Sequence, residues 1–300
     1  MEKKLLEGLI TPIMTPFNRD NEQTINYEAT KQLVDYVIEN GVDGIFVLGS
    51  NGEFSVLTKE EKLEFTKKVL EYVDDRVPVY AGPGTCSTQE TVELAKEMEK
   101  LGVSALSVIS PYFVKLTDDE LYEHFKTVAE SVGIPVILYN IPRMTGNPIS
   151  KEVFERLSTL KNIAGIKDSS RDLDNLKNYI EVAKKHNLKV LVGSDGIIMT
   201  GYKMGTSGAI AGMSNVIPKI MSNLFKALND GDDELAEKYQ NEVNYIRDVN
   251  KKATMPVVLK RALELADISK AGPARKPALE SSSDLDEEII SMLKHYELVK

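Results

Sequence analysis

The 300-residue sequence contains one cysteine, Cys86, and no tryptophan. A single thiol excludes an intramolecular disulfide framework, and this cysteine usage favours a reducing compartment. The three histidines, His124, His186 and His295, are too far apart in the chain to show metal-ligand spacing. Neither a disulfide scaffold nor a histidine metal centre is therefore expected.

Long hydrophobic runs are also absent. No window approaches ~18 consecutive apolar residues, and Glu7 interrupts the short apolar run near the start, with no small-residue cleavage pattern after it. The net charge of −9 disfavours binding to nucleic acid or to an anionic membrane, because the long-range field repels phosphates. We therefore expect a cytoplasmic protein that binds small molecules, with no nucleic-acid or membrane partner.

Short apolar runs, in contrast, recur along the first two thirds of the chain. Eight of them have strand length, from "LITPIMTPF" to "TSGAIAGMS", and segments with helical periodicity lie between them. Hydroxyl residues with a glutamate three positions later indicate helix starts, and glycines before the next strand indicate helix ends. The starts are Thr58, Ser87 and Thr117, and the ends are Gly41, Gly102 and Gly133.

Eight strands with intervening helices predict a parallel sheet of the α/β class, and eight is the number that closes into a (β/α)8 TIM barrel. An open doubly wound sheet is the alternative, but no G-x-G-x-x-G follows the first strand. After about residue 230 the pattern is helical with no strands between. The predicted domains are a barrel over residues 1–230, which carries the active site, and a C-terminal helical region over 231–300.

In such a barrel the chemistry lies at the C-terminal ends of the strands. Lys167 ends the apolar run that begins at Ile163, and a lysine that loses water there favours the neutral amine, which can attack a carbonyl and form a Schiff base. The alternatives are a lysine that reaches solvent or pairs with Asp168, and a merely solvated phenol at Tyr139. The strand-end rule selects Thr15, the loop 49–53, Tyr112, Tyr139, Lys167, residues 193–196 and Ser214.

Three motifs change the balance between these interpretations. "GSNGEFSVLTKEEK", "YNIPRMTG" and "GIKDSS", in this order, resemble the pyruvate-dependent class I aldolases of the dihydrodipicolinate synthase and N-acetylneuraminate lyase family. The resemblance covers nearly the whole chain. It implies a lyase with a (β/α)8 barrel and C-terminal helices, usually assembled as a homotetramer.

The resemblance also implies roles for individual residues. Lys167 is the Schiff-base nucleophile, and Tyr139 moves protons to and from the carbinolamine and the substrate hydroxyl. Ser50 and the backbone amides around Asn51 hold the pyruvate carboxylate. No metal and no cofactor beyond the covalent imine at Lys167 is expected. Further substrate contacts are expected at Gly49, Thr15, Gly193, Asp195 and Ile210. Ser214, near the last strand end, is a weaker candidate for the site. His124 is expected to have a structural role.

The chain departs from the synthases of this family at three places. Met144 stands where they carry an arginine that binds aspartate semialdehyde, and the preceding Arg143 would point elsewhere in an extended stretch. Phe113 stands where they supply a second tyrosine across a subunit contact. Asn51 replaces a second loop hydroxyl. All three departures concern the same reaction.

The sialic acid lyases fit little better, because Gly196 and Gly212 stand where they place a carboxylate and a serine for sugar hydroxyls. The segments "GSNGEF", "PYFVKLTDDEL" and "YNIPRMTG" most resemble those of aldolases that reversibly cleave 2-keto-3-deoxy sugar acids or 4-hydroxy-2-oxoglutarate to pyruvate and an aldehyde. Three alternatives remain: a 4-hydroxy-tetrahydrodipicolinate synthase in lysine biosynthesis, a dehydratase that shares the imine chemistry, and a barrel that has lost catalysis and serves as a binding protein.

Overall fold

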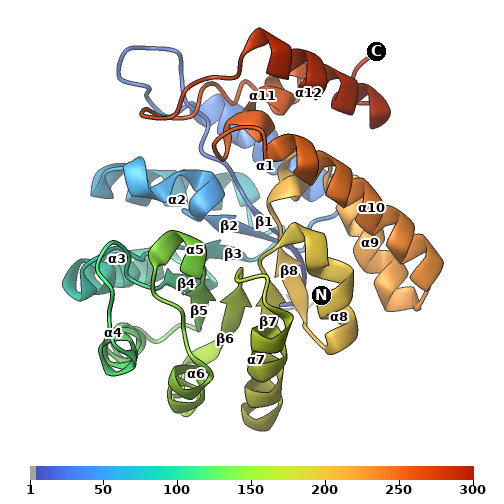
Figure 1. Cartoon of the computed structure of the whole chain (residues 1–300). Coiled ribbons are helices and arrows are strands. Elements are labelled where there is room, and N and C mark those ends of the chain that lie inside the picture. Colours follow the sequence, from blue (N-terminus) through green and yellow to red (C-terminus); the bar gives the residue numbers. More distant parts are fainter. Residues whose placement is uncertain (1–4) are drawn as a thin grey trace. The chain divides into compact units, whose positions relative to one another are not determined.

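Eight short strands form the centre of the computed structural model, which describes residues 5–300 (Figure 1). They are hydrogen-bonded in sequence order and close into a barrel. The prediction of a (β/α)8 barrel is therefore confirmed. The strands are β1 Gly8–Pro12, β2 Gly44–Val47, β3 Val79–Ala81, β4 Ala105–Ile109, β5 Val136–Asn140, β6 Ile163–Asp168, β7 Lys189–Val192 and β8 Gly208–Ile210.

Strands β4 to β8 pair in parallel, and their register decides which side chains are neighbours. Ile109 of β4 pairs with Tyr139 of β5, and Tyr139 pairs with Lys167 of β6. Every residue of β4 and β5 is buried, as expected for parallel strands that are covered on both faces. A lysine and a tyrosine therefore lie side by side at the C-terminal ends of two neighbouring strands.

Twelve α-helices and four 3-10 turns connect or follow the strands in the described part of the chain. The helices are α1 Tyr27–Glu39, α2 Lys59–Val73, α3 Thr88–Leu101, α4 Asp118–Glu130, α5 Pro142–Thr145, α6 Lys151–Leu157, α7 Leu173–His186, α8 Ile198–Met204, α9 Pro218–Asp230, α10 Asp233–Asn250, α11 Val257–Leu265 and α12 Ser283–His295. The 3-10 turns are η1 Ser50–Gly52, η2 Phe54–Val56, η3 Asp195–Ile197 and η4 Gly212–Asn215.

Most of the predicted helix boundaries are confirmed. Thr58 and Thr117 form complete capping boxes, and Ser87 accepts a hydrogen bond from the third backbone amide of α3. Gly102 ends α3 in the left-handed conformation, with φ +92°, where glycine avoids the Cβ clash of other residues. The prediction at Gly133 was wrong, because α4 already ends at Ser131 with ordinary helical angles.

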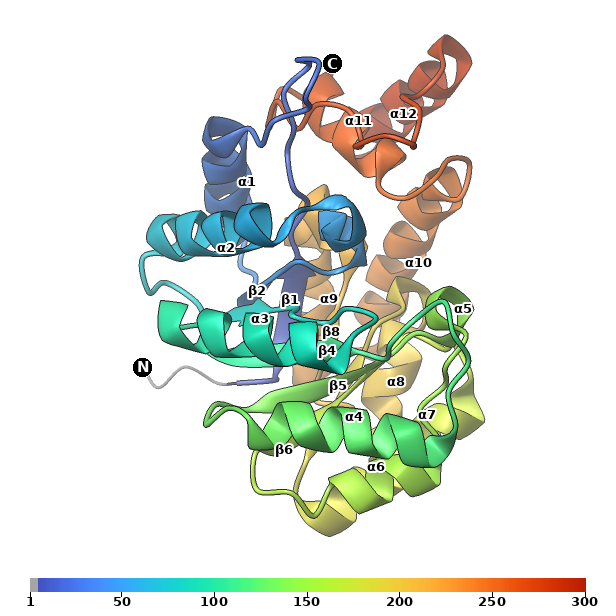
Figure 2. The ribbon, with the colours of Figure 1, turned by 90° about the vertical axis from the view of Figure 1, so that its left-hand side faces the viewer.

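The chain divides into two compact units, each built from two separate segments. One unit comprises the chain up to Ile10 together with Pro78–Ala211, and it contains strands β3 to β8. Helices α3, α4 and α6 of this unit lie side by side (Figure 2). The buried faces of α4 and α6 carry leucine, valine and phenylalanine at helical spacing, and that of α3 carries leucine, alanine and methionine.

The other unit comprises Thr11–Val77 and Gly212–Lys300. Helices α9 and α10 lie against each other in it (Figure 1), and α12 packs on α10 and α11. From residue 218 to residue 300 the structure contains helices and loops, as the pattern predicts. The predicted domain boundary falls at the end of α9, and the division into domains at that residue stays a prediction.

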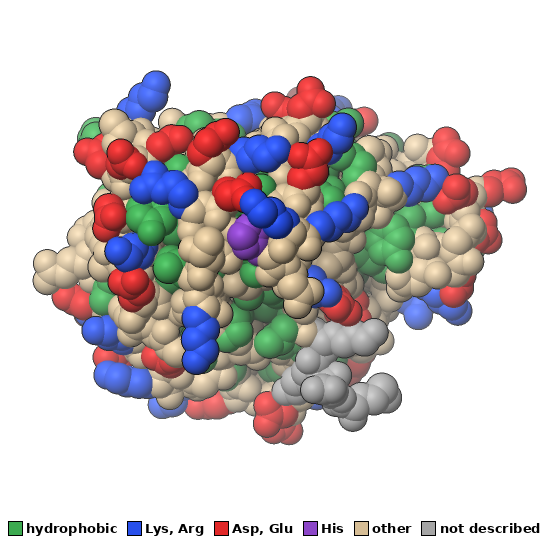
Figure 3. Space-filling view, turned by 90° about the horizontal axis from the view of Figure 1, so that it is seen from below, with side chains coloured by type: hydrophobic (Ala, Val, Ile, Leu, Met, Phe, Trp, Pro, Cys, Tyr) green, Lys and Arg blue, Asp and Glu red, His purple; other side chains and the backbone are tan. Residues whose placement is uncertain are grey.

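The surface carries charges of both signs. In the face seen from below, Lys and Arg side chains alternate with Asp and Glu side chains (Figure 3). Several of them are paired between neighbouring helices, such as Lys151 of α6 with Glu181 of α7 at 2.9 Å. None of the helices within residues 5–300 has the length and apolar content needed to cross a membrane.

Candidate active site

Lys167 and Tyr139 form the centre of the candidate site. The Lys167 Nζ lies 3.8 Å from the centroid of the Tyr139 ring, and each residue is 4% exposed. Their strands are hydrogen-bonded neighbours, so the backbone holds the amine and the phenol at a fixed separation.

The neighbouring Asp168 is bound elsewhere. Its carboxylate accepts hydrogen bonds from the Asn140 amide at 2.8 Å and from the Ser170 hydroxyl at 2.8 Å. Successive side chains of a strand point to opposite faces, which separates this carboxylate from the Lys167 amine. Burial raises the pKa of Asp168, and these hydrogen bonds oppose the rise. Asp168 therefore has hydrogen-bond partners in Asn140 and Ser170, and its pairing with Lys167 stays an alternative.

Gly193 leaves the space that the Lys167 side chain occupies. A Cβ atom at this position would lie 2.9 Å from the Lys167 Cε and 2.0 Å from the Ser169 Oγ. The Gly193 amide also donates to the Asp168 carbonyl at 2.7 Å. The structure thus places Gly193 directly against the Lys167 side chain, and the predicted contact of Gly193 with substrate stays a prediction.

Two further predicted contacts lie in the same unit. Asp195 opens η3, directly after β7, and Ile210 ends β8 and is 1% exposed. Both positions follow the strand-end rule by which the sequence analysis selects barrel sites. Their contact with substrate stays a prediction.

The other unit contains the loop of residues 49–53. Its η1 turn is closed by the Gly52 amide, which donates to the Gly49 carbonyl at 2.9 Å. The Thr15 hydroxyl donates to the Gly52 carbonyl at 2.7 Å. A Cβ at Gly49 would lie 2.7 Å from the Phe46 ring, so only glycine fits there without displacing the ring. Thr15 therefore lies against the loop that contains Gly49, Ser50 and Asn51, and the contact of these residues with substrate stays a prediction.

Asn51 and Gly212 are physically linked. A Cβ at Gly212 would lie 2.8 Å from the Asn51 Nδ2, and the Asn51 Oδ1 is buried with no hydrogen-bond partner in the described residues 5–300. The loss of a side chain at Gly212 thus gives room to the Asn51 amide. The Asn51 Oδ1 is thus a buried acceptor available to a ligand or a water molecule.

Ser214 and His124 have structural contacts. The Ser214 Oγ lies 2.8 Å from the Thr11 Oγ1, and both residues are fully buried. The His124 Nδ1 lies 2.8 Å from the Thr88 Oγ1, and burial lowers the pKa of His124 to about 4. The structural interpretation of His124 is consistent with these contacts.

Known proteins that resemble this chain belong to one enzyme family. The Dihydrodipicolinate synthetase family matches residues 5–296. The chain belongs to this family. It is 35% identical to the 4-hydroxy-tetrahydrodipicolinate synthase of Methanococcoides burtonii, with 97% of this chain and 98% of that protein covered. It is 34% identical to Escherichia coli YagE, whose name proposes a 2-dehydro-3-deoxy-D-gluconate aldolase, with 98% and 96% covered.

Solved structures of the dihydrodipicolinate synthetase family agree with the fold. The dihydrodipicolinate synthase of Thermotoga maritima superimposes with a TM-score of 0.94 at 31% identity, covering 99% of this chain and 100% of that chain. Escherichia coli YagE in complex with pyruvate superimposes with a TM-score of 0.93 at 32% identity, again covering 99% and 100%. Membership of the family confirms the predicted enzyme class, a carbon–carbon lyase.

The structure corrects one argument about the synthase arginine. The sequence analysis places Arg143 and Met144 in an extended stretch, but Pro142–Thr145 forms the single helical turn α5. Neighbouring side chains of a helix are about 100° apart rather than on opposite faces. Both residues are exposed, Met144 to 62%. The arginine is still displaced from the position of Met144, but by a smaller rotation than expected.

Two charged residues outside the predicted site, the buried Lys260 and the partly buried Arg275, contact Glu53 of the 49–53 loop. Lys260 is 1% exposed and lies 2.6 Å from Glu53, and the Arg275 amide donates to Glu53 at 2.8 Å. A lysine within the apolar helical run "PVVLKRALELAD" was the available signal, since an amphipathic pattern places it on the buried face.

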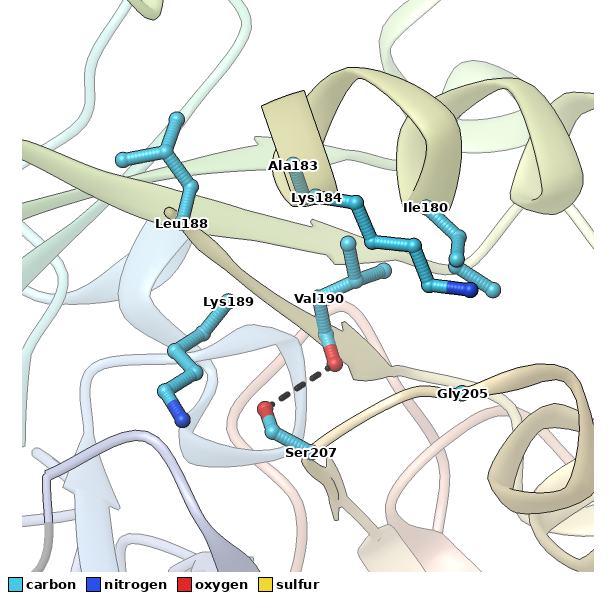
Figure 4. Close-up of a pocket in the computed structure, with 8 residues that line it drawn as sticks. All are labelled: Ile180, Ala183, Lys184, Leu188, Lys189, Val190, Gly205 and Ser207. Atoms are coloured by element: carbon cyan, nitrogen blue, oxygen red, sulfur yellow. Dashed lines mark hydrogen bonds between the residues drawn. The ribbon is translucent and has the colours of Figure 1, made fainter. Parts of the chain in front are cut away.

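A pocket of about 260 Å³ lies away from these residues, in the unit that contains Lys167. Lys189 opens β7 and Ser207 precedes β8, so the pocket lies at the N-terminal ends of these strands (Figure 4). The Ser207 hydroxyl donates to the Val190 carbonyl at 3.2 Å, and Lys189 pairs with Glu7 at 2.9 Å. In barrels that end usually serves stability, so this pocket is not the candidate active site.

Proposed function

We propose that this chain is a class I aldolase that reversibly cleaves a 2-keto-3-deoxy sugar acid, or a related 4-hydroxy-2-oxo acid, to pyruvate and an aldehyde. The observation that carries the proposal is the buried Lys167 amine 3.8 Å from the Tyr139 ring at the C-terminal ends of β5 and β6, in a member of a lyase family.

The reaction begins with the neutral Lys167 amine, which adds to the C2 carbonyl of the substrate and gives a carbinolamine. The Tyr139 phenol protonates the departing hydroxyl, which leaves as water, and an iminium ion and a phenolate remain. The phenolate then accepts the proton of the C4 hydroxyl. The C3–C4 bond breaks, its electron pair neutralises the iminium ion as an enamine, and the aldehyde departs.

Tyr139 returns its proton to C3 of the enamine, and a water molecule hydrolyses the resulting imine to release pyruvate and free Lys167. The covalent imine thus serves where other lyases use a cofactor. Ser50 and the amides around Gly49 and Asn51 bind the substrate carboxylate, because oriented N–H and O–H dipoles stabilise an anion at low cost of reorganisation. The remaining substrate contacts in this proposal are Thr15, Gly193, Asp195 and Ile210.

The choice of substrate rests on the departures from the synthases. Met144 offers no positive charge to the carboxylate of aspartate semialdehyde, Phe113 has no hydroxyl for a proton relay, and Asn51 replaces a loop hydroxyl. The similarity to YagE, which is named for an aldolase of a sugar acid and was solved with pyruvate, supports the same choice. Assembly as a homotetramer in the cytoplasm, inferred from the resemblance and the composition, is part of the proposal.

The second candidate is a 4-hydroxy-tetrahydrodipicolinate synthase that condenses pyruvate with aspartate semialdehyde. It is favoured by the relatives at 33% to 35% identity that carry this name. Both candidates form the same pyruvate adduct with Lys167, and they differ in the aldehyde that reacts with it.

The test is to incubate the protein with 2-keto-3-deoxygluconate, reduce with borohydride and map the modified peptide by mass spectrometry. A three-carbon adduct on Lys167 is the expected result, because cleavage leaves only the pyruvate carbons on the amine, whereas a dehydratase retains all carbons. Trapping with pyruvate alone, followed by faster condensation with aspartate semialdehyde than with any simple aldehyde, would establish the synthase instead. The absence of an adduct with either compound would reject the imine chemistry and favour the alternative of a binding protein.

A further inference from the structure

The 49–53 loop is attached to the C-terminal helices through a buried ion pair. Lys260 of α11 is 1% exposed, and its Nζ lies 2.6 Å from the Glu53 Oε1. The same ammonium donates to the Pro273 carbonyl at 3.0 Å and lies 4.1 Å from the centroid of the Phe17 ring. All these residues belong to the unit Thr11–Val77 and Gly212–Lys300.

The second carboxylate oxygen of Glu53 is bound as well. The Arg275 backbone amide donates to the Glu53 Oε2 at 2.8 Å. The Arg275 guanidinium makes two hydrogen bonds of 2.7 Å to the Glu61 carboxylate and lies 4.3 Å from the Phe17 ring. Glu53 is therefore held at both oxygens by residues that follow β8 in the chain, and the residue that holds Oε2 is itself fixed by a bidentate pair.

Glu53 stands at a strained point of the loop. It adopts the left-handed conformation, with φ +56°, between η1 and η2. A glutamate in this conformation persists only where the surrounding structure holds it, because the left-handed region costs a residue with a Cβ free energy. The ion pair supplies that restraint at the C-terminal end of η1, and Thr15 supplies the second one through the Gly52 carbonyl.

Stability alone explains this pair poorly. Burial lowers the pKa of Lys260 to about 8, although Glu53 acts to raise it, so the removal of water from the ammonium is only partly compensated. A buried ion pair is often no more stabilising than a well-packed apolar pair, and its advantage lies in fixing one geometry.

We infer that Lys260 and Arg275 are positioning residues of the active site: through the Glu53 carboxylate, the C-terminal helical region fixes η1 so that Ser50 and the adjacent backbone amides are arranged to bind the substrate carboxylate. The inference rests on the proposed function, because it assumes that this loop binds pyruvate. It assigns the C-terminal helices an effect on substrate affinity.

The test measures the pyruvate concentration that gives half-maximal borohydride trapping on Lys167, well below the melting temperature of each variant. This readout requires no knowledge of the aldehyde. The variants are Lys260→Met, which keeps the length of the side chain and removes the charge, and the double variant Glu53→Gln/Lys260→Met. Lys252→Met, which removes a half-exposed lysine paired with Glu288, is the matched control.

We expect Lys260→Met to raise the half-maximal pyruvate concentration at least about tenfold, since small displacements of positioning groups have large effects, while Lys252→Met leaves it unchanged. The double variant separates positioning from stability. It leaves no unpaired buried charge, so its melting temperature recovers toward that of the wild type, but the pyruvate requirement stays raised because the restraint on Glu53 is lost.

Two results would overturn the inference. If the wild type is trapped by pyruvate and Lys260→Met needs the same concentration, or if the double variant regains wild-type affinity together with its stability, the pair only stabilises the fold. A wild type that forms no adduct at all would reject the proposed function, and this inference with it, and is distinguished from the first two results by the absence of any trapped peptide.

Discussion

Lys167 and Lys260 are both buried against an aromatic ring, yet their surroundings differ. Lys260 lies 2.6 Å from a carboxylate, 4.1 Å from the Phe17 ring and on a helix. Lys167 is the last residue but one of strand β6 and lies 3.8 Å from the centroid of the Tyr139 ring. The nearest carboxylate in sequence, Asp168, is hydrogen-bonded to Asn140 and Ser170. The carboxylate partner of Lys260 fixes one geometry of the pair, whereas Lys167 lies beside a phenol that can donate a proton, and the proposed chemistry is assigned to Lys167.

The largest difference is expected when each lysine is replaced in turn and the lyase reaction is measured. Lys167→Arg keeps a positive charge but removes the nucleophile, and we expect kcat to fall by on the order of 10⁶-fold, as for other covalent nucleophiles. Borohydride trapping should be lost completely. Lys161→Arg, at an exposed position, is the control, and an adduct that persists in Lys167→Arg would show that another amine is the nucleophile.

The tyrosine that distinguishes the two lysines provides the second prediction. Tyr139→Phe keeps the ring over the amine and removes the hydroxyl, so we expect kcat to fall by about 10² to 10⁴-fold through loss of proton transfer. Prolonged incubation with pyruvate should still label Lys167. Steady-state kinetics and trapping on the same preparation check this, and a variant with unchanged kcat would reduce Tyr139 to a packing residue.

The free energy of unfolding should depend on Lys260 more than on Lys167. Lys260→Met leaves Glu53 buried without its ammonium partner, which is expected to lower the free energy of unfolding by about 3 to 5 kcal/mol. Glu53→Gln/Lys260→Met should recover part of this loss. Urea titration followed by circular dichroism measures both, and the interpretation fails if the double variant is less stable than the single one.

A third buried base, His124, extends the comparison to pH. Burial lowers its pKa from 6.5 to about 4, so between these values the unfolded chain binds a proton that the folded chain does not. The stability that neutral His124 contributes is fully present above pH 6.5. It is lost as the pH falls toward 4, and the free energy of unfolding then decreases by about 3 kcal/mol at most.

His124→Gln removes the titrating group and should flatten the acid limb of the stability curve in this range. Chemical denaturation at a series of pH values measures the slope. An identical slope in the variant would assign the acid sensitivity to other groups.

The smallest effect is expected at the glycine beside the loop. Gly212→Ala places a methyl group 2.8 Å from the Asn51 Nδ2, and such overpacking costs about 1 to 3 kcal/mol. Asn51→Ala in the same chain should relieve the strain. The melting temperatures of Gly212→Ala and of the double variant test the contact between the two positions. If the effects of the two substitutions on stability simply add, the positions are independent.

Local patterns were sufficient to predict the barrel and the central pair. Apolar runs and capping boxes depend on neighbouring residues, and parallel strands bring their C-terminal ends together whatever the rest of the chain does. Lys167 and Tyr139 were therefore found from position alone, and the resemblance added their chemistry. The same reasoning failed at Arg143, where an extended segment was assumed and a helical turn is present.

Contacts between segments that are far apart in the chain decided the details of the site that local patterns do not predict. The side to which Asp168 turns, the space that Gly212 leaves for Asn51, and the attachment of Glu53 to Lys260 each join residues that are far apart in the chain or on opposite faces of a strand. Such contacts follow from how the packed elements meet, because burial, unlike periodicity, depends on every neighbour at once. Periodicity and strand-end position therefore selected Lys167, whereas the contact of α11 with the 49–53 loop revealed the restraint on Glu53.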